Sequence, residues 1–196
     1  HYIMDYLVEE VLRTQSESVR SFLLQTSILG RMCGSLCNAV VDAKSRAGVD
    51  GQEMLQLLEQ MNLFIVPLDN ERHWYRYHHL FGDVLNRRLA YLFQDQLPNL
   101  RGRAAHWYAE NGLIPEAIHY ALTAGDTDFA IQLIEQNGCL LLIRGELSTL
   151  PNWIKAVEPY ARTRPWIYIF KAWLSALTGY PEQVEPMLQT AENLIY

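Results

Sequence analysis

The sequence predicts a mainly α-helical protein: a winged-helix domain with a short β-hairpin, followed by tetratricopeptide-like helical hairpins. Apolar residues recur at helical spacing over most of the 196 residues. Two segments rich in β-forming residues interrupt that period, and residues 106–122 match residues 172–188 at a constant offset of 66. We therefore expect a winged-helix domain over residues 1–95 and the start of a helical-repeat region over residues 96–196.

Four helices are expected before the hairpin. Thr14 and Glu17 have the spacing of a capping box, in which each side chain satisfies a free backbone amide. This pattern predicts a helix that begins beside Thr14 and ends near Gly30. The same apolar periodicity predicts the other three helices over residues 2–13, 36–41 and 53–61.

The predicted hairpin lies between the fourth and fifth helices. Its first strand is the continuous apolar run LFIVPL (63–68), and its second is the alternating run HWYRYH (73–78). Alternation places Trp74, Arg76 and His78 on one face and Tyr75 and Tyr77 on the other. The helix that follows has a polar side made of Asp83, Asn86 and Arg87, and an apolar stripe made of Leu80, Phe81, Val84, Leu85, Leu89 and Leu92.

The second half carries an internal repeat. The matched pairs are Trp107/Trp173, Pro115/Pro181, Glu116/Glu182 and Leu122/Leu188. The offset of 66 is about twice the 34-residue tetratricopeptide period, and a glycine-containing turn with a Pro-Glu helix start recurs. Equivalent positions in stacked hairpins predict that Leu122 and Leu188 are both buried. We interpret Trp107, Trp166 and Trp173 as hairpin core, because aromatic side chains dominate core area.

Charge argues against nucleic acid as a direct partner of this chain. The sequence has 16 Lys and Arg against 22 Asp and Glu, a net charge of -6. Residues 1–95 carry 9 basic and 12 acidic side chains and residues 96–196 carry 7 and 10, so each part is near -3. Neither part offers the basic face that phosphate contacts require. We interpret Arg87 and Arg88 as a solvated helix face.

The cysteines and the apolar runs predict a cytoplasmic protein without a membrane partner. Cys33 and Cys37 lie one helical turn apart and Cys139 is isolated, so packing is favoured over a zinc site, for which further ligands are missing. No apolar run approaches the roughly 18 residues that span a bilayer. The chain opens on His1 directly into a helical pattern, which we interpret as part of a longer protein.

No catalytic motif is recognisable, so we expect no enzyme activity from this chain. A P-loop, a G-x-S-x-G turn and an H-E-x-x-H helix are all missing from the sequence. The most reactive pattern is the pair His78 and His79, directly before the fifth helix. Two interpretations stay open: a core or turn histidine bonded to backbone, or a donor to a phosphate oxygen.

The run from Glu10 to Leu89, and above all YRYHHLF (75–81), resembles the ATP-dependent LuxR-type transcriptional regulators related to the maltose-regulon activator MalT. HWYAENGLIPEAIHYALTAGDTDFAIQLIEQNG (106–138) is similar to the start of their helical-repeat region. These regulators are signal-transduction ATPases with a nucleotide-binding domain, a winged-helix domain, a tetratricopeptide-like sensor and a LuxR-type helix-turn-helix. The resemblance implies that this chain is a middle fragment, without the P-loop domain and the DNA reader.

The resemblance also implies a role for His78. In related switch ATPases a Met-His-Asp motif in the winged helix contacts the β-phosphate of ADP, and Tyr77-His78-His79 is similar to it in position. His78 matches the phosphate-contacting histidine, whereas His79 replaces the aspartate and its role stays open. The fragment itself is then expected to hold no cofactor, and the full-length protein to bind ATP and ADP and to hydrolyse ATP.

The implied function is a regulatory segment that couples the nucleotide state, through the winged helix, to sensing by the helical repeats. Its implied partners are the protein's own nucleotide-binding domain and a small-molecule inducer or inhibitory protein at the repeats, with oligomerisation in the active full-length state. The alternative is a helical-repeat interaction scaffold with the winged helix as a structural cap.

Overall fold

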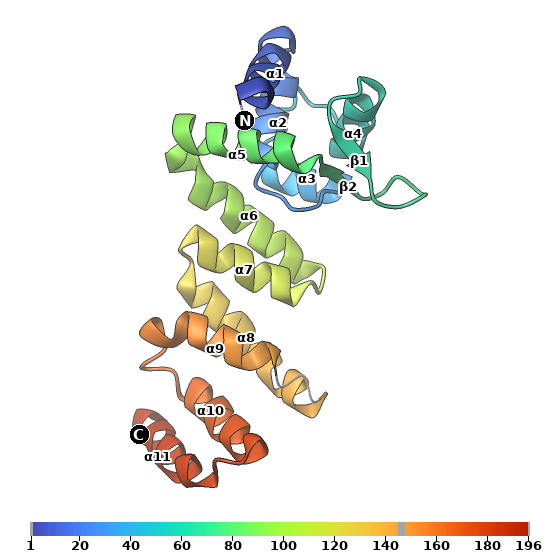
Figure 1. The fold of residues 1–196 in the computed structure, drawn as a ribbon. Coiled ribbons are helices and arrows are strands. Elements are labelled where there is room, and N and C mark those ends of the chain that lie inside the picture. The colour runs from blue at the N-terminus through green and yellow to red at the C-terminus, as the bar shows by residue number, and fades with distance from the viewer. Residues whose placement is uncertain (1, 145–147, 196) are drawn as a thin grey trace. The chain divides into compact units, whose positions relative to one another are not determined.

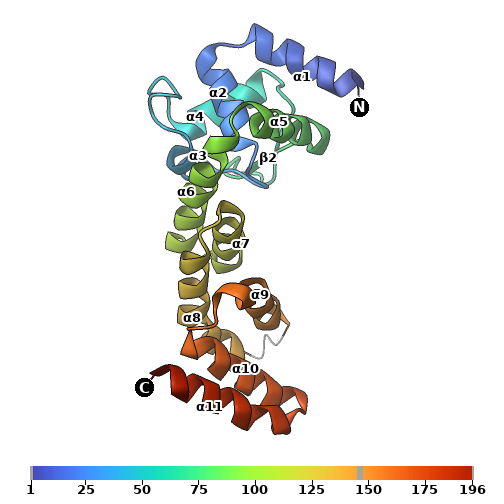
Figure 2. The same ribbon diagram turned by 90° about the vertical axis from the view of Figure 1, so that its left-hand side faces the viewer.

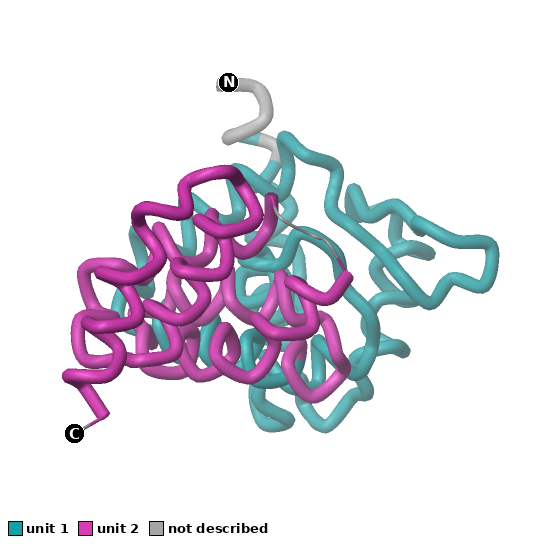
Figure 3. Tube along the Cα trace, turned by 90° about the horizontal axis from the view of Figure 1, so that it is seen from below, with its two compact units in different colours: residues 1–107 teal, residues 108–196 magenta. Residues whose placement is uncertain are grey.

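The computed structural model describes the backbone of residues 2–144 and 148–195, with side chains at Tyr6 and from Val8 onward. The chain divides into two compact units, residues 1–107 and residues 108–196 (Figure 3), and each is described by itself. Helix α6 (Leu97–Glu110) contains the division. The domain boundary at residue 95 stays a prediction.

The first unit consists of five helices and a β-hairpin, followed by a short turn of helix and most of α6 (Figure 1). Both the hairpin and the helices around it occur where periodicity predicts them. Their bounds are α1 (Tyr2–Thr14), α2 (Glu17–Thr26), α3 (Gly34–Val40), α4 (Gly51–Gln60), β1 (Ile65–Pro67), β2 (Tyr75–Tyr77), α5 (His79–Leu92) and η1 (Gln94–Gln96).

The cap of α2 differs from the prediction. Ser16, not Thr14, is the N-cap, and its side chain accepts a hydrogen bond from the amide of Val19 at 3.4 Å. Thr14 is the last residue of α1, where its hydroxyl donates to the carbonyl of Glu10 at 3.0 Å. The capping box of Thr14 is therefore wrong, because α1 continues through this residue. Helix α2 also ends at Thr26, before the predicted stop at Gly30.

The hairpin is antiparallel, and its register confirms the predicted faces. Arg76 pairs with Val66 and is exposed, whereas Tyr75 and Tyr77 are buried. A backbone bridge between Met32 and Tyr75 ties the hairpin to the segment after α2. The Met32 amide donates to the Tyr75 carbonyl at 2.7 Å, and the Tyr75 amide donates to the Met32 carbonyl at 2.8 Å. Tyr77 and the buried hydroxyl of Thr26 lie 2.6 Å apart, so a polar contact joins α2 to β2 inside the core.

Helix α5 buries a narrower stripe than predicted. Phe81, Val84, Leu85 and Leu89 are buried, but Leu80 and Leu92 are 38% and 50% exposed. The difference arises at the two ends of the helix, where these two side chains project from its turns into solvent. Cys33 and Cys37 are buried as free thiols, as expected from packing, whereas Cys139 in the second unit is exposed.

Helices α3 and α4 approach each other through two glycines. A side chain at Gly51 would lie 2.4 Å from the carbonyl oxygen of Gly34, so only hydrogen fits. The same corner is held by polar groups: the Asn38 amide donates to Asp50 at 2.7 Å, and Asp50 accepts from the amide of Gln52 at 2.8 Å. These bonds lower the pKa of Asp50, the hydrogen bond from Asn38 most strongly.

The second unit consists of helical hairpins (Figure 1). Gly125 and Gly179 end α7 and α10 in the left-handed conformation, with φ of 83° and 87°. Helix α7 packs on α8, α8 on α9, and α10 on α8, α9 and α11. The bounds are α7 (Ile114–Ala124), α8 (Thr127–Ile143), α9 (Thr149–Val157), η2 (Glu158–Tyr160), α10 (Pro165–Thr178), η3 (Pro181–Gln183) and α11 (Val184–Ile195).

Three aromatic and aliphatic side chains predicted to lie in the core of this unit are on its surface. Trp166, Trp173 and Leu188 are 49%, 54% and 40% exposed, whereas Leu122 and Trp107 are partly buried. Phe170, one turn from Trp166, fills the core instead and contacts the position of Gly138 on α8. No described helix is long and apolar enough to cross a membrane.

Candidate functional site

The two histidines lie at the junction of β2 and α5. His78 is the N-cap residue of α5, and its carbonyl accepts the amide of Gly82 at 3.0 Å. Both imidazoles are exposed, and their rings lie 4.6 Å apart. His78 is therefore not a core histidine. Its role as a phosphate contact stays a prediction, and its imidazole lies on the surface with access to a ligand.

A strained residue fixes the backbone of this junction. The amide of His78 donates to the carbonyl of Phe64 at 2.7 Å, and Phe64 has a φ of 52°. A bulky residue in this left-handed region costs about 1–2 kcal/mol. The ring of Phe64 stacks on Phe81 at 5.0 Å, which offsets part of that cost by aromatic packing. The start of α5 is thus anchored to the entrance of β1.

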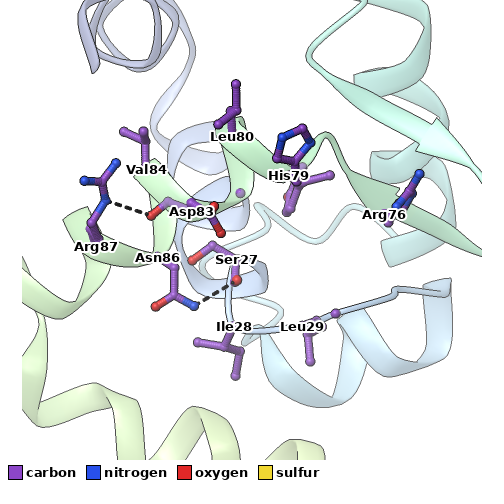
Figure 4. Close-up of a pocket in the computed structure, with 13 residues that line it drawn as sticks. Ser27, Ile28, Leu29, Arg76, His79, Leu80, Asp83, Val84, Asn86 and Arg87 are labelled. Carbon is purple, nitrogen blue, oxygen red and sulfur yellow. Dashed lines mark hydrogen bonds between the residues drawn. The ribbon is translucent and has the colours of Figure 1, made fainter. Parts of the chain in front are cut away.

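An open groove of about 800 Å³ lies beside the junction (Figure 4). Its walls come from the segment after α2, from β2 and from α5. Arg76, His79 and Arg87 line it together with one carboxylate, Asp83. His78 is not among the lining residues. The other residues that line the groove are Ser27, Ile28, Leu29, Gly30, Tyr77, Leu80, Gly82, Val84 and Asn86.

Side-chain hydrogen bonds hold the walls of the groove in place. The Asn86 amide donates to the carbonyl of Ser27 at 3.1 Å and so ties α5 to the segment after α2 (Figure 4). The Arg87 Nε lies 3.4 Å from the carbonyl of Asp83. Asn86 is therefore half-buried and structural, not part of a solvated polar side as predicted.

The groove is positively charged within an acidic chain. The groove is lined by two guanidinium groups and one carboxylate, although the whole sequence carries a net charge of -6. The Arg76 guanidinium makes no hydrogen bond or ion pair with the part of the chain that the structure describes, whereas its backbone pairs with Val66. Guanidinium forks bind carboxylate and phosphate groups in two-bonded geometry. The arrangement can hold an anionic group. Among the described residues no cluster of three His, Cys, Asp or Glu could hold a metal ion.

Aromatic and ionic contacts on both faces hold the second strand of the hairpin. The Tyr75 hydroxyl donates to Glu59 at 3.1 Å, and Glu59 also pairs with Arg72 at 3.0 Å. Burial, then the hydrogen bond and charge of Glu59, raise the pKa of Tyr75 to about 12. The Trp74 ring lies 4.6 Å from the Arg31 guanidinium and 6.3 Å from the Trp107 ring. These contacts fix the position of β2, on which Arg76 sits.

Sequence reasoning missed Arg87 as a groove residue. It was interpreted as part of a solvated face with Arg88, and Arg88 does lie 3.9 Å from Glu9 on the outside. The spacing of His79, Asp83 and Arg87 could have revealed the shared face, since residues four apart lie on one side of a helix. The partner of Asn86 carries no such signal, because Ser27 is 59 residues away.

Comparison with protein families finds a match for most of the first unit. Residues 8–97 match the MalT winged helix domain. This part of the chain belongs to that family. The β2–α5 junction and the charged groove are therefore features of a MalT winged helix domain, and every residue that lines the groove lies inside the matched range.

The homology extends beyond the winged helix. The HTH-type transcriptional regulators MalT of Vibrio campbellii and Vibrio parahaemolyticus are 32% and 30% identical over 98% of this chain. The serine/threonine-protein kinase PknK of Mycobacterium tuberculosis is 37% identical over 98% of this chain. The aligned region covers 21% of each regulator and 17% of the kinase, so the chain spans about a fifth of these relatives.

Proposed function

We propose that this chain is the regulatory segment of an ATP-dependent transcriptional activator. In this proposal the winged helix couples the nucleotide state to the rest of the protein, and the helical hairpins, taken as tetratricopeptide-like, sense an inducer or inhibitory protein. The observation that carries the proposal is a positively charged groove beside an exposed histidine in a MalT winged helix domain.

The chemistry of the junction suits a switch that responds to an anion. His78 offers a ring N–H to a phosphate oxygen, while Arg76 and Arg87 draw an acidic surface or phosphate group toward the groove. ATP or ADP would be held chiefly by a separate nucleotide-binding domain of the longer protein. A ligand shifts a conformational equilibrium only through its different affinity for the two states. His78 would act by strengthening ADP binding in the closed state alone.

The relatives support a role in signalling more than a role in one particular output. A protein named as a kinase and proteins named as transcriptional regulators share the segment at similar identity. A segment common to both is best explained as the input or coupling part. We assign the transcriptional output by homology to the MalT regulators.

A second function is favoured by the surface of the second unit. Trp166 and Trp173 on α10 are about half exposed, and their spacing of seven residues places them on the same side of the helix. A helical scaffold that binds another protein, with the winged helix as a cap, would use such a surface. The two proposals differ in whether nucleotide affinity depends on the winged helix.

The first prediction tests His78 in the longer protein. His78→Ala should release ADP about tenfold to a hundredfold faster, because a hydrogen bond to a charged group contributes roughly 1.5–3 kcal/mol. Transcription without inducer should rise, and the melting temperature should stay unchanged, since the imidazole is exposed. Stopped-flow release of a fluorescent ADP analogue, a reporter assay and thermal melts provide the three measurements.

His73→Ala is the matched control, because His73 is also exposed but lies before β2, at the other end of this strand from the β2–α5 junction. Its ADP release should equal that of the parent protein. A folded His78→Ala protein that retains ADP as tightly as the parent would eliminate the nucleotide role and leave the scaffold.

A further inference from the structure

Helix α6 is one unbroken helix that contains the division between the two units (Figures 1 and 2). The division falls between two consecutive aromatic residues, Trp107 and Tyr108. The Trp107 ring meets the Trp74 ring of the first unit edge-on, with ring centres 6.3 Å apart. Tyr108 is buried and stacks on Tyr120 of α7 in the second unit at 5.2 Å. Consecutive helical residues differ by about 100° in direction, so a single turn of α6 contacts each unit with a different side chain.

A second contact on the Trp107 side of α6 involves Arg103. The two residues are four apart, which places them on the same side of the helix. The Arg103 guanidinium donates to Asp42, in the segment after α3, at 2.6 Å. Arg103 and Trp107, here called the coupling face, therefore contact two separate segments of the first unit. A rotation or shift of α6 would change both contacts.

The Trp74 contact acts on the strand that leads to His78. The Trp74 amide donates to Asp69 at 3.0 Å, and the Trp74 carbonyl accepts the amide of Leu68 at 2.8 Å. Trp74 directly precedes β2, which is three residues long, and His78 directly follows it. A displacement of the Trp74 ring would therefore act at one end of a short strand whose other end is the β2–α5 junction.

The coupling face is held by contacts that are easily exchanged for solvent. The Asp42 side chain is 64% exposed, so its ion pair with Arg103 is screened by salt. The Arg103 Nε is buried and has no hydrogen-bond partner among the described residues. An unpaired buried donor disfavours the docked arrangement, because water would satisfy it after release. These features lower the free energy needed to release α6 from the winged helix.

We propose that the coupling face is the device through which the two units influence each other. In the docked state Arg103 and Trp107 hold α6 on the first unit and order the turn from which Tyr108 stacks on Tyr120. Release of the face by an event in the second unit frees Trp74, and the β2–α5 junction then opens more often. The inference rests on the coupling role proposed above, and it acts in both directions because coupling free energies are reciprocal.

Hydrogen exchange of the 196-residue chain tests this device without nucleotide. Trp107→Leu keeps an apolar side chain but removes the ring contact. It should raise exchange of the Leu68 and His78 amides about threefold to tenfold, the effect of losing one aromatic pair. Trp107→Phe should retain most of the protection. Trp173→Leu is the matched control and should leave both amides unchanged, since the Trp173 ring is about half exposed and lies in the second unit.

The reverse direction is tested by changes in the first unit. Trp74→Leu should raise exchange of the Leu113 amide, which donates to the Tyr108 carbonyl at 2.9 Å. Asp42→Asn should act in the same direction but more weakly, because the ion pair that it removes is exposed. Asp95→Asn is its control, since Asp95 is an exposed carboxylate on η1.

Three results would overturn the proposal. Equal exchange of Leu68 and His78 in Trp107→Leu and Trp173→Leu would mean that the ring contact does not hold the hairpin. A uniform rise through the first unit, including the buried part of α4, would indicate a general loss of stability. Unchanged exchange of Leu113 in Trp74→Leu would reduce Trp107 to local packing. Because no nucleotide is present, none of these results depends on the outcome for His78→Ala.

Discussion

The two units are built from contacts of different range along the sequence. In the first, Thr26 meets Tyr77 and Ser27 meets Asn86, contacts that span 51 and 59 residues. In the second, most packing is between consecutive helices, such as α7 with α8 and α10 with α11. The second unit is therefore stabilised mainly by contacts between neighbouring helices, whereas the first unit is built around one closed core.

This difference explains where each unit offers a functional surface. The closed core of the first unit fixes a junction in which strand, helix and loop meet, and the charged groove lies there. The second unit has large apolar side chains exposed along its helices, among them Trp166 and Trp173 of α10. The first unit thus offers a groove with charged walls, and the second offers apolar side chains on the surface of its helices.

The largest expected effect is in the first unit. Gly51→Ala would place a methyl group 2.4 Å from the carbonyl of Gly34 and 3.0 Å from Cys37, and backbone cannot move aside cheaply. We expect a loss of about 3 kcal/mol, the upper end for overpacking. Because this core is closed, amide protection should fall throughout the unit in hydrogen exchange.

Gly102→Ala on α6 provides the control, since an added methyl group there meets nothing within 4 Å. It should raise stability by up to about 1 kcal/mol. Loss of protection confined to α3 and α4 in Gly51→Ala would contradict a single closed core.

A smaller and local effect is expected in the second unit. Gly138→Ala would bring a methyl group 2.6 Å from two ring carbons of Phe170, but the ring can tilt away. We expect a loss of about 1–2 kcal/mol, restricted to α8, α10 and their neighbours in hydrogen exchange. Combining it with Phe170→Leu should cost less than the sum of the two single changes. If amides of the first unit lost protection equally, the contrast between the units would fail.

The smallest expected effect is a loss of stability at alkaline pH, which is absent at neutral pH. Tyr75 has a pKa of about 12, and burial also raises the pKa of Tyr77 above its ordinary value near 10. A tyrosine whose pKa is higher in the folded than in the unfolded state stabilises the fold. This stabilisation is fully present below pH 10 and is lost as the pH rises toward 12. Melts between pH 8 and about 11.5 should show this loss, and Tyr75→Phe should reduce it. An unchanged slope in Tyr75→Phe would mean that Tyr75 is not shielded as described.

Periodicity predicts the architecture well because burial follows it directly. Tyr75 and Tyr77 alternate with Arg76 in the sequence, and the structure buries the two tyrosines. The cap of α2 was less predictable, since Thr14 and Ser16 both offer a hydroxyl and only the actual end of α1 decides between them. The exposure of Trp173 was not predictable either, because a helical pattern does not reveal which apolar face another helix covers.

The candidate site was predictable only in part. Its location at His78 follows from a strand signal next to a helix signal, and the sequence contains both. The groove depends on Ser27 and Asn86 coming together, which requires the whole first unit to fold. Local patterns report neighbours along the chain, and a groove between distant segments is invisible to them.

Phe64 places an unusual restriction on which sequences can occupy this junction. A substitution at position 64 must tolerate a φ of 52° and also supply a ring for Phe81. Glycine meets the first demand and valine or isoleucine meets neither. The carbonyl of Phe64 accepts the amide of His78, which lies fourteen residues later. The residues that position 64 can hold are therefore limited by the backbone geometry at the start of α5. The contact uses backbone atoms alone, so any residue except proline can keep it at position 78, whereas a change at position 64 would disturb the start of α5.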